Sequence, residues 1–173
     1  MIAAYHGTSW LSRRIIKFTR SPLGISHVGW VDHDWSVWEA WTRGGLLHNA
    51  SLWSVHTPGT IVDLFDVDGL TDAQRLLVAD WFERHEGAPY DFASIFGFIT
   101  RKFMDGNPSG LFCSEAVYAA LEYAGRPLLR STEPAPTEAW QVDPSMLLRS
   151  PLLKWVGTFD HPENLQAITH QHG

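Results

Sequence analysis

The sequence predicts a single globular domain in which short β-strands come first and helices follow. The length of 173 residues suits one domain, and a hydrophobic fraction of 45% with 18% charged residues provides enough apolar material for a core. Short apolar runs separated by turn residues fill the stretch 26–67, whereas helical spacing prevails over 71–123. The domain is expected to span residues 1–160, followed by a polar C-terminal tail at 161–173.

Local patterns place the individual elements. Period-two apolar runs bounded by Gly, Pro and Asp predict strands at 26–31, 36–41, 46–52, 60–67 and 152–159. Apolar residues at helical spacing, with capping residues before them and glycine or proline after them, predict helices at 8–19, 71–87, 92–103, 114–123 and 144–148.

The strands 26–31 and 36–41 should form a β-hairpin around the turn 32–34. If Val31 faces Trp35 across this hairpin, His27 falls opposite Glu39 on the same face of the sheet. This register is an assumption, because a slip of one residue would place the two side chains on opposite faces.

Composition excludes several classes of function. The formal net charge is -6 and the basic residues are scattered, so nucleic acid is not an expected partner. No apolar run approaches the roughly 20 residues of a membrane span, so no integral membrane segment is expected. The first residues lack the basic start and apolar core of a signal peptide.

The one cysteine of the chain, Cys113, stands where a helix is expected to begin. A single thiol excludes an intramolecular disulfide and a cysteine-rich zinc site. Unpaired N–H groups and the positive end of the helix dipole favour the thiolate, which is the nucleophilic form. These properties predict a nucleophilic cysteine that needs a base nearby.

Among nine histidines, His27 is the best candidate for that base. It opens a strand after a glycine-containing loop, where a side chain can be held rigidly; a structural, hydrogen-bonded histidine is the alternative. Glu39 lies between apolar neighbours, where a carboxylate is costly unless paired. An imidazolium at His27 would supply that pairing, and Glu39 would orient its ring. A solvent-facing Glu39 is the alternative.

Cofactor signatures are weak. The chain has no His-Glu-x-x-His run, no cysteine pair and no phosphate-cradling glycine loop, so neither a metal nor a cofactor is expected. Five tryptophans cluster in the strand-rich region, as either core packing or an aromatic wall for a lipid, sugar or peptide substrate; they are Trp30, Trp35, Trp38, Trp41 and Trp53.

Four motifs occur in an order typical of one family: 7–13 (Gly-Thr-Ser-Trp-Leu-Ser-Arg), 26–30 (Ser-His-Val-Gly-Trp), 38–40 (Trp-Glu-Ala) and 112–115 (Phe-Cys-Ser-Glu). In this respect the chain resembles the circularly permuted branch of the NlpC-type papain-like cysteine peptidase superfamily, the YiiX/YebB-like group. The resemblance runs from Gly7 to Leu148. Gly44-Gly45 departs from the single glycine more usual in the family, which affects the expected substrate pocket rather than the triad.

The resemblance implies a papain-like α+β fold, with a small antiparallel barrel-like sheet packed against the cysteine-bearing helix. It implies Cys113 as nucleophile, His27 as general base and Glu39 as the residue that orients His27. Tyr90 resembles a family tyrosine that assists the Cys113 backbone N–H in holding an oxyanion; a buried tyrosine with a satisfied hydroxyl is the alternative.

The expected function is a cysteine hydrolase that cleaves an amide bond in a peptide or cell-wall (peptidoglycan) peptide through a thioester acyl-enzyme. Two alternatives stay open. One is a lipid acyltransferase or thioesterase of the same fold, and the other is a non-catalytic papain-like binding or virion component. The expected location is cytoplasmic or virion-associated, and the sequence leaves the oligomeric state undetermined.

Overall fold

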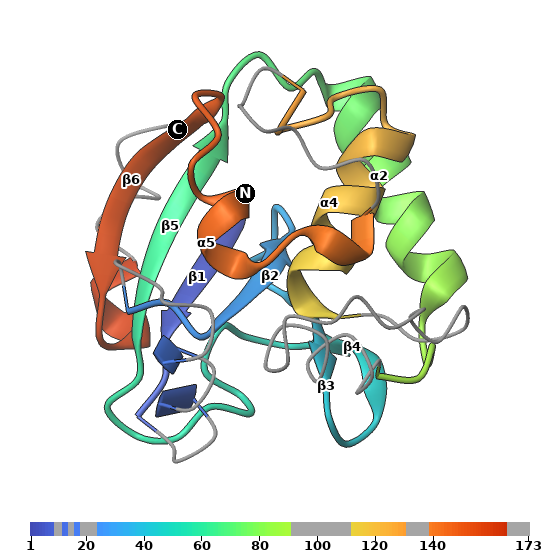
Figure 1. Cartoon of the computed structure of the whole chain (residues 1–173). Helices are drawn as coiled ribbons and strands as arrows, with labels where there is room; N and C mark the ends of the chain where they lie inside the picture. The colour runs from blue at the N-terminus through green and yellow to red at the C-terminus, as the bar shows by residue number, and fades with distance from the viewer. Residues whose placement is uncertain (9–11, 14–15, 18–23, 91–111, 131–138, 166–173) are drawn as a thin grey trace.

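A computed structural model of the chain describes residues 1–8, 12–13, 16–17, 24–90, 112–130 and 139–165. Its centre is a six-stranded sheet in the order β4-β3-β2-β1-β5-β6, in which every pairing is antiparallel (Figure 1). The strands are β1 (Ile2–His6), β2 (His27–Val31), β3 (Val37–Trp41), β4 (Gly45–Asn49), β5 (Ile61–Val67) and β6 (Leu153–Phe159). The chain is therefore a mixed α+β protein.

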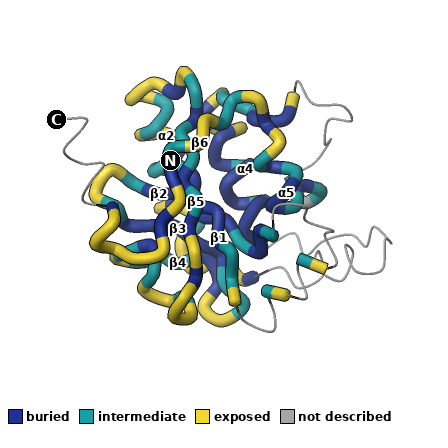
Figure 2. Tube along the Cα trace, turned by 90° about the vertical axis from the view of Figure 1, so that its left-hand side faces the viewer, coloured by how far each residue is buried: buried dark blue, intermediate teal, exposed yellow. Residues whose placement is uncertain are grey.

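The helices pack beside this sheet. They are α2 (Asp72–His85), α4 (Cys113–Tyr123) and the short α5 (Pro144–Leu147). Helix α4 contacts α2, α5, β2 and β3, and Figure 2 shows it buried over most of its length. The expected caps are present, because Thr71 and Gln74 form a capping box on α2 and Asp143 accepts from Met146 N at the start of α5.

Strand β1 is central in the sheet and was not predicted from the sequence. Its residues alternate between two hydrophobic clusters: Ile2 and Ala4 belong to the cluster that includes α4, and Ala3 and Tyr5 belong to a cluster with β5 residues. A strand buried on both faces shows no period-two pattern, which explains why the segment gave no strand signal.

The register assumed for the first hairpin was wrong. Val31 pairs with Val37 rather than with Trp35, so the turn spans 32–36. Asp32 fixes the longer turn, since its carboxylate accepts from the indole N–H groups of Trp30 and Trp38 at 3.1 and 2.9 Å. The shift is two residues, an even number, so the side-chain faces are unchanged.

The corrected register places Gly29 opposite Glu39 and leaves Glu39 diagonal to His27. A methyl group at Gly29 would lie 2.9 Å from Glu39 Cγ, the Trp38 carbonyl oxygen and Val37 Cγ2. The missing side chain therefore gives the Glu39 side chain its space beside β2.

We expect Gly29→Ala to lower the free energy of unfolding by about 1–3 kcal/mol through overpacking, measured by urea denaturation. It should also slow alkylation of Cys113, because the displaced Glu39 no longer holds His27. Gly157→Ala is the matched control: it is also a strand glycine, but its new methyl meets the phenyl ring of Phe159, a side chain that can move. Equal losses in the two variants would contradict a special role for Gly29.

The structure also bears on the helices expected at 8–19 and 92–103 and on the predicted tail. Ser12, Arg13, Ile16 and Lys17 are helical, as predicted for 8–19, whereas the helix expected at 92–103 lies outside the described residues. At the predicted tail, residues 162–165 form a short 3-10 helix and Leu165 is buried in the cluster that contains Tyr5.

Gly44 and Gly45 have φ values of +99° and +74°, so the turn before β4 accounts for both glycines. Among the helices that the structure describes, none has the length and apolar character needed to cross a membrane.

Candidate active site

Cys113 is the first residue of α4. The preceding residue, Phe112, has extended backbone angles (φ −94°, ψ 153°) and carries no side-chain hydrogen-bond acceptor, so its side chain does not cap the helix. The helix start is held in two other ways: Phe112 N donates to Glu115 Oε2 at 3.1 Å, and the buried Ser114 hydroxyl donates to the Val142 carbonyl at 2.5 Å. The carbonyl of Val142 thus anchors the turn that carries the thiol.

His27 is the first residue of β2, and its side chain interacts with Cys113. Burial acts to lower the pKa of His27, but the charge of the Cys113 thiolate, a hydrogen bond to it, and the contact with Glu39 raise this pKa to about 10. His27 is thus an imidazolium near neutral pH, and it lies between the Cys113 sulfur and the ionised Glu39 carboxylate. An imidazolium beside a thiol is a setting in which a cysteine can act as a nucleophile.

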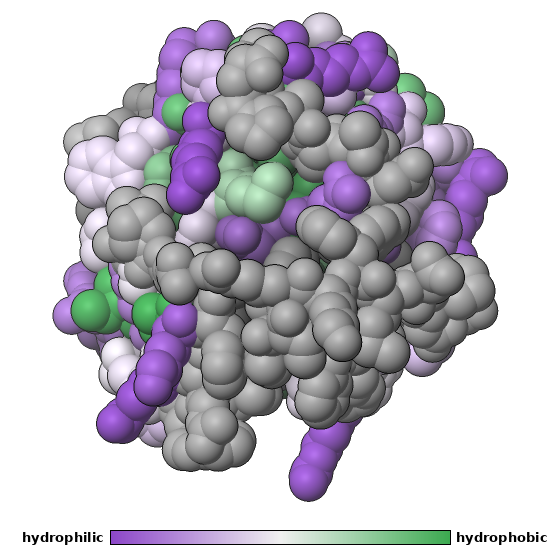
Figure 3. Space-filling model, in the orientation of Figure 1, coloured by the Kyte–Doolittle hydropathy of each residue, from purple (hydrophilic) through white to green (hydrophobic). Residues whose placement is uncertain are grey.

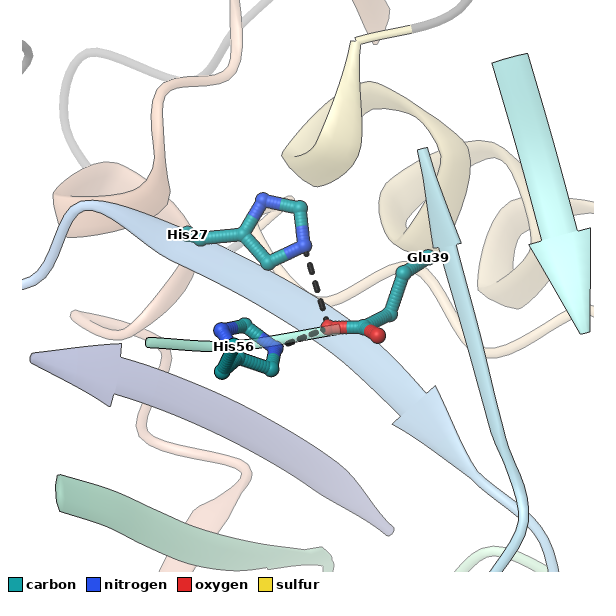
Figure 4. Close-up of side chains that lie close together, drawn as sticks. All are labelled: His27, Glu39 and His56. Atoms are coloured by element: carbon teal, nitrogen blue, oxygen red, sulfur yellow. Dashed lines mark hydrogen bonds and ion pairs between the residues drawn. The ribbon is translucent and has the colours of Figure 1, made fainter. Parts of the chain in front are cut away.

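Glu39 carries a buried charge with several donors around it. Its side chain is 0% exposed, and its Oε1 lies 3.2 Å from His27 Nε2 (Figure 4). Asn49 Nδ2 donates to its other oxygen, Oε2, at 2.9 Å. Burial acts to raise the pKa of Glu39, but the imidazoles of His27 and His56 outweigh burial and lower it to about 2. Glu39 is therefore ionised, and the solvent-facing alternative for it was wrong.

His56 is the site residue that sequence reasoning missed. It lies in the connection between β4 and β5, and its Nε2 donates to Glu39 Oε1 at 2.8 Å. Its ring stacks on Tyr5 with centroids 3.8 Å apart and meets Trp41 edge-on at 5.0 Å. No periodic pattern marks a residue in such a loop; the available signal was that a buried Glu39 needs more donors than one histidine provides.

Tyr90 is buried and packs edge-on against the Phe112 ring, with centroids 6.1 Å apart. It therefore lies beside the residue that precedes Cys113. This position is compatible with the expected oxyanion role and with plain core packing, so the role of Tyr90 stays a prediction.

The tryptophans serve mainly as core residues. Trp30 and Trp38 are buried in the cluster that includes α4, and Trp35 and Trp53 pack against the second cluster. Among the ring contacts of these five tryptophans with His27 and His56, those of Trp41 stand out, with its ring 4.8 Å from that of His27. An aromatic wall built from all five is therefore not what the fold contains.

One group of three potential metal ligands occurs in the described part of the chain: His27, Glu39 and His56, with ligand atoms within 4.8 Å of one another. Both Nε2 atoms approach the same carboxylate oxygen, at 3.2 and 2.8 Å. A tetrahedral zinc ion would hold such ligands roughly 3.3 Å apart and would need both nitrogens without their protons. The shorter distance is that of a hydrogen bond, so we treat the cluster as a hydrogen-bonded one.

The structure thus brings together Cys113, His27 and Glu39 from α4, β2 and β3, and adds His56 and Asn49 around the carboxylate. In comparisons of the sequence with protein-family models and with curated proteins, nothing matches. The papain-like resemblance therefore rests on the four sequence motifs alone.

Proposed function

We propose that this chain is a papain-like cysteine hydrolase that cleaves an amide bond of a peptide or cell-wall peptide. The observation that supports the proposal best is the interaction of Cys113, at the first turn of α4, with an imidazole whose pKa is raised to about 10. A buried carboxylate fixes that imidazole from its other side. Cys113, His27 and Glu39 thus follow one another in the order that acyl transfer requires of a nucleophile, a base and an orienting residue.

In the proposed reaction the Cys113 thiolate attacks the scissile carbonyl carbon and forms a C–S bond. The Cys113 backbone N–H, with Tyr90 as a second candidate donor, stabilises the oxyanion. His27 gives its proton to the leaving amine as the C–N bond breaks, which leaves a thioester. Neutral His27 then takes a proton from water, and the resulting hydroxide attacks the thioester and releases the acid and the thiolate.

The first test is alkylation of the single thiol by iodoacetamide at pH 6 and pH 9, in wild type and His27→Ala. We expect the wild type to react at least about tenfold faster than His27→Ala at pH 6, because the imidazolium stabilises the reactive thiolate. The thiol of the unfolded chain in guanidinium gives the reference rate. Equal rates in the two folded proteins would contradict the proposal.

The lipid alternative is tested on substrates. Incubation with peptide amides, peptidoglycan peptides and acyl lipids, followed by intact-mass measurement, identifies the acyl group that Cys113 retains. On the face shown in Figure 3, hydrophobic side chains of described residues form small patches between hydrophilic ones.

The non-catalytic alternative has one observation in its favour. Cys113 is 2% exposed, so a substrate carbonyl reaches its sulfur only if neighbouring groups move. A Cys113→Ala protein that retains its full biological activity would support this alternative.

A further inference from the structure

Glu39 holds two imidazoles, and the stronger contact is not the one to His27. Oε1 accepts a well-formed hydrogen bond from His56 Nε2 at 2.8 Å. The same oxygen lies 3.2 Å from His27 Nε2, but the His27 N–H is not aligned for a hydrogen bond. Figure 4 shows both rings directed at one carboxylate from different sides. The direction of that carboxylate is therefore set by His56 and, through Oε2, by Asn49.

The His56 ring itself is fixed. Its side chain is 5% exposed, Tyr5 stacks on it with an interplanar angle of 15°, and Trp41 packs against its edge. The backbone N–H of His56 also donates to the Trp53 carbonyl, at 3.2 Å. A ring held by stacking and by its own backbone can orient a neighbour, because it does not need that neighbour for its own position.

The charges around His56 favour a neutral ring. Burial lowers its pKa, Glu39 acts in the opposite direction, and the positive charge of His27 lowers the pKa further. From β1, the Tyr5 hydroxyl faces the same carboxylate, and burial with the Glu39 charge raises the Tyr5 pKa well above its usual value. Tyr5 is thus neutral as well, and among the described groups of the site His27 is the cation that offsets the charge of Glu39.

We infer that His56 is a positioning residue for the Cys113–His27 pair: its imidazole fixes the Glu39 carboxylate, and Glu39 fixes the His27 ring. This inference rests on the proposed function. It assigns to the β4–β5 connection a role in the reaction, which His56 exerts through the Glu39 carboxylate.

The test compares two variants by alkylation at pH 6 and by thermal unfolding. His56→Phe keeps a flat ring against Tyr5 but has no N–H donor, and we expect it to slow Cys113 alkylation at pH 6 by about tenfold. His56→Gln keeps a neutral N–H donor of similar reach and should restore most of the wild-type rate. A folded His56→Phe protein that reacts like the wild type would overturn the inference, as would equal slowing in both variants.

A measurement on the wild type makes the result independent of how well the variants fold. Ring nitrogen chemical shifts at pH 7 should show His56 neutral, with its proton on Nε2. A proton on Nδ1 alone, or on both nitrogens, would overturn the inference. Failure of the proposed function has a different signature: wild type and His27→Ala then react alike, whatever the His56 variants do.

Discussion

Glu39→Ala is expected to lower the free energy of unfolding by about 3–5 kcal/mol at pH 7, the cost of removing one partner of a buried ion pair. The change leaves the buried His27 imidazolium without its carboxylate. It also removes the acceptor of the His56 Nε2–H and the Asn49 amide. Each buried donor left without a partner adds to the loss. Urea denaturation monitored by tryptophan fluorescence measures it.

Two further variants make this result specific. Glu39→Gln keeps the shape and one acceptor oxygen but not the charge, so its loss should be intermediate. Glu163→Ala removes a carboxylate whose side chain is 84% exposed and should change the free energy of unfolding by less than about 0.5 kcal/mol. A loss below about 1 kcal/mol for Glu39→Ala would contradict the role of Glu39 as a buried, paired anion.

The pKa of His27 is expected to fall clearly below its value of about 10 when Cys113 is replaced by alanine. The substitution removes the thiolate charge and its hydrogen bond, whereas burial, which lowers the pKa, remains. Titration of the ring nitrogens by NMR measures the change. Cys113→Ser is the matched control: its hydroxyl can still hydrogen-bond but stays neutral, so the pKa should again fall. An unchanged pKa in both variants would show that the thiolate does not act on His27.

The raised pKa of His27 also predicts how the free energy of unfolding depends on pH. A folded-state pKa of about 10, above the usual value of about 6.5 for the unfolded chain, means that the folded protein binds the His27 proton more tightly. The stabilisation is fully present below about pH 6.5 and is lost as the pH rises through about 10. His27→Gln should therefore show a flatter loss of stability over this range in urea titrations.

The sequence sufficed to propose Cys113, His27 and Glu39 as a group because their local settings are distinctive. A helix start favours the thiolate of a lone cysteine, and a carboxylate between apolar strand residues is costly without a partner. The expected register of the hairpin was wrong by two residues, but an even shift keeps Glu39 on the same face of the sheet as His27.

The missed parts lie where the local sequence carries no periodic signal. The segment Ile2–His6 is packed on both faces, so nothing distinguishes its apolar residues as a strand. His56 belongs to a connection whose position depends on distant contacts with Tyr5 and Glu39. Such contacts arise from tertiary packing, which single-sequence patterns do not encode.

The central place of β1 has a consequence for how the chain folds. Strand β1 is synthesised before both of its partners, and its pairing with β5 joins positions as distant as Ile2 and Phe65, 63 residues apart. Until β5 exists, one edge of an apolar strand has no hydrogen-bonding partner. We therefore expect refolding in milliseconds to seconds rather than microseconds. Early intermediates should be prone to intermolecular strand pairing, and β1 is the segment to protect in expression and refolding.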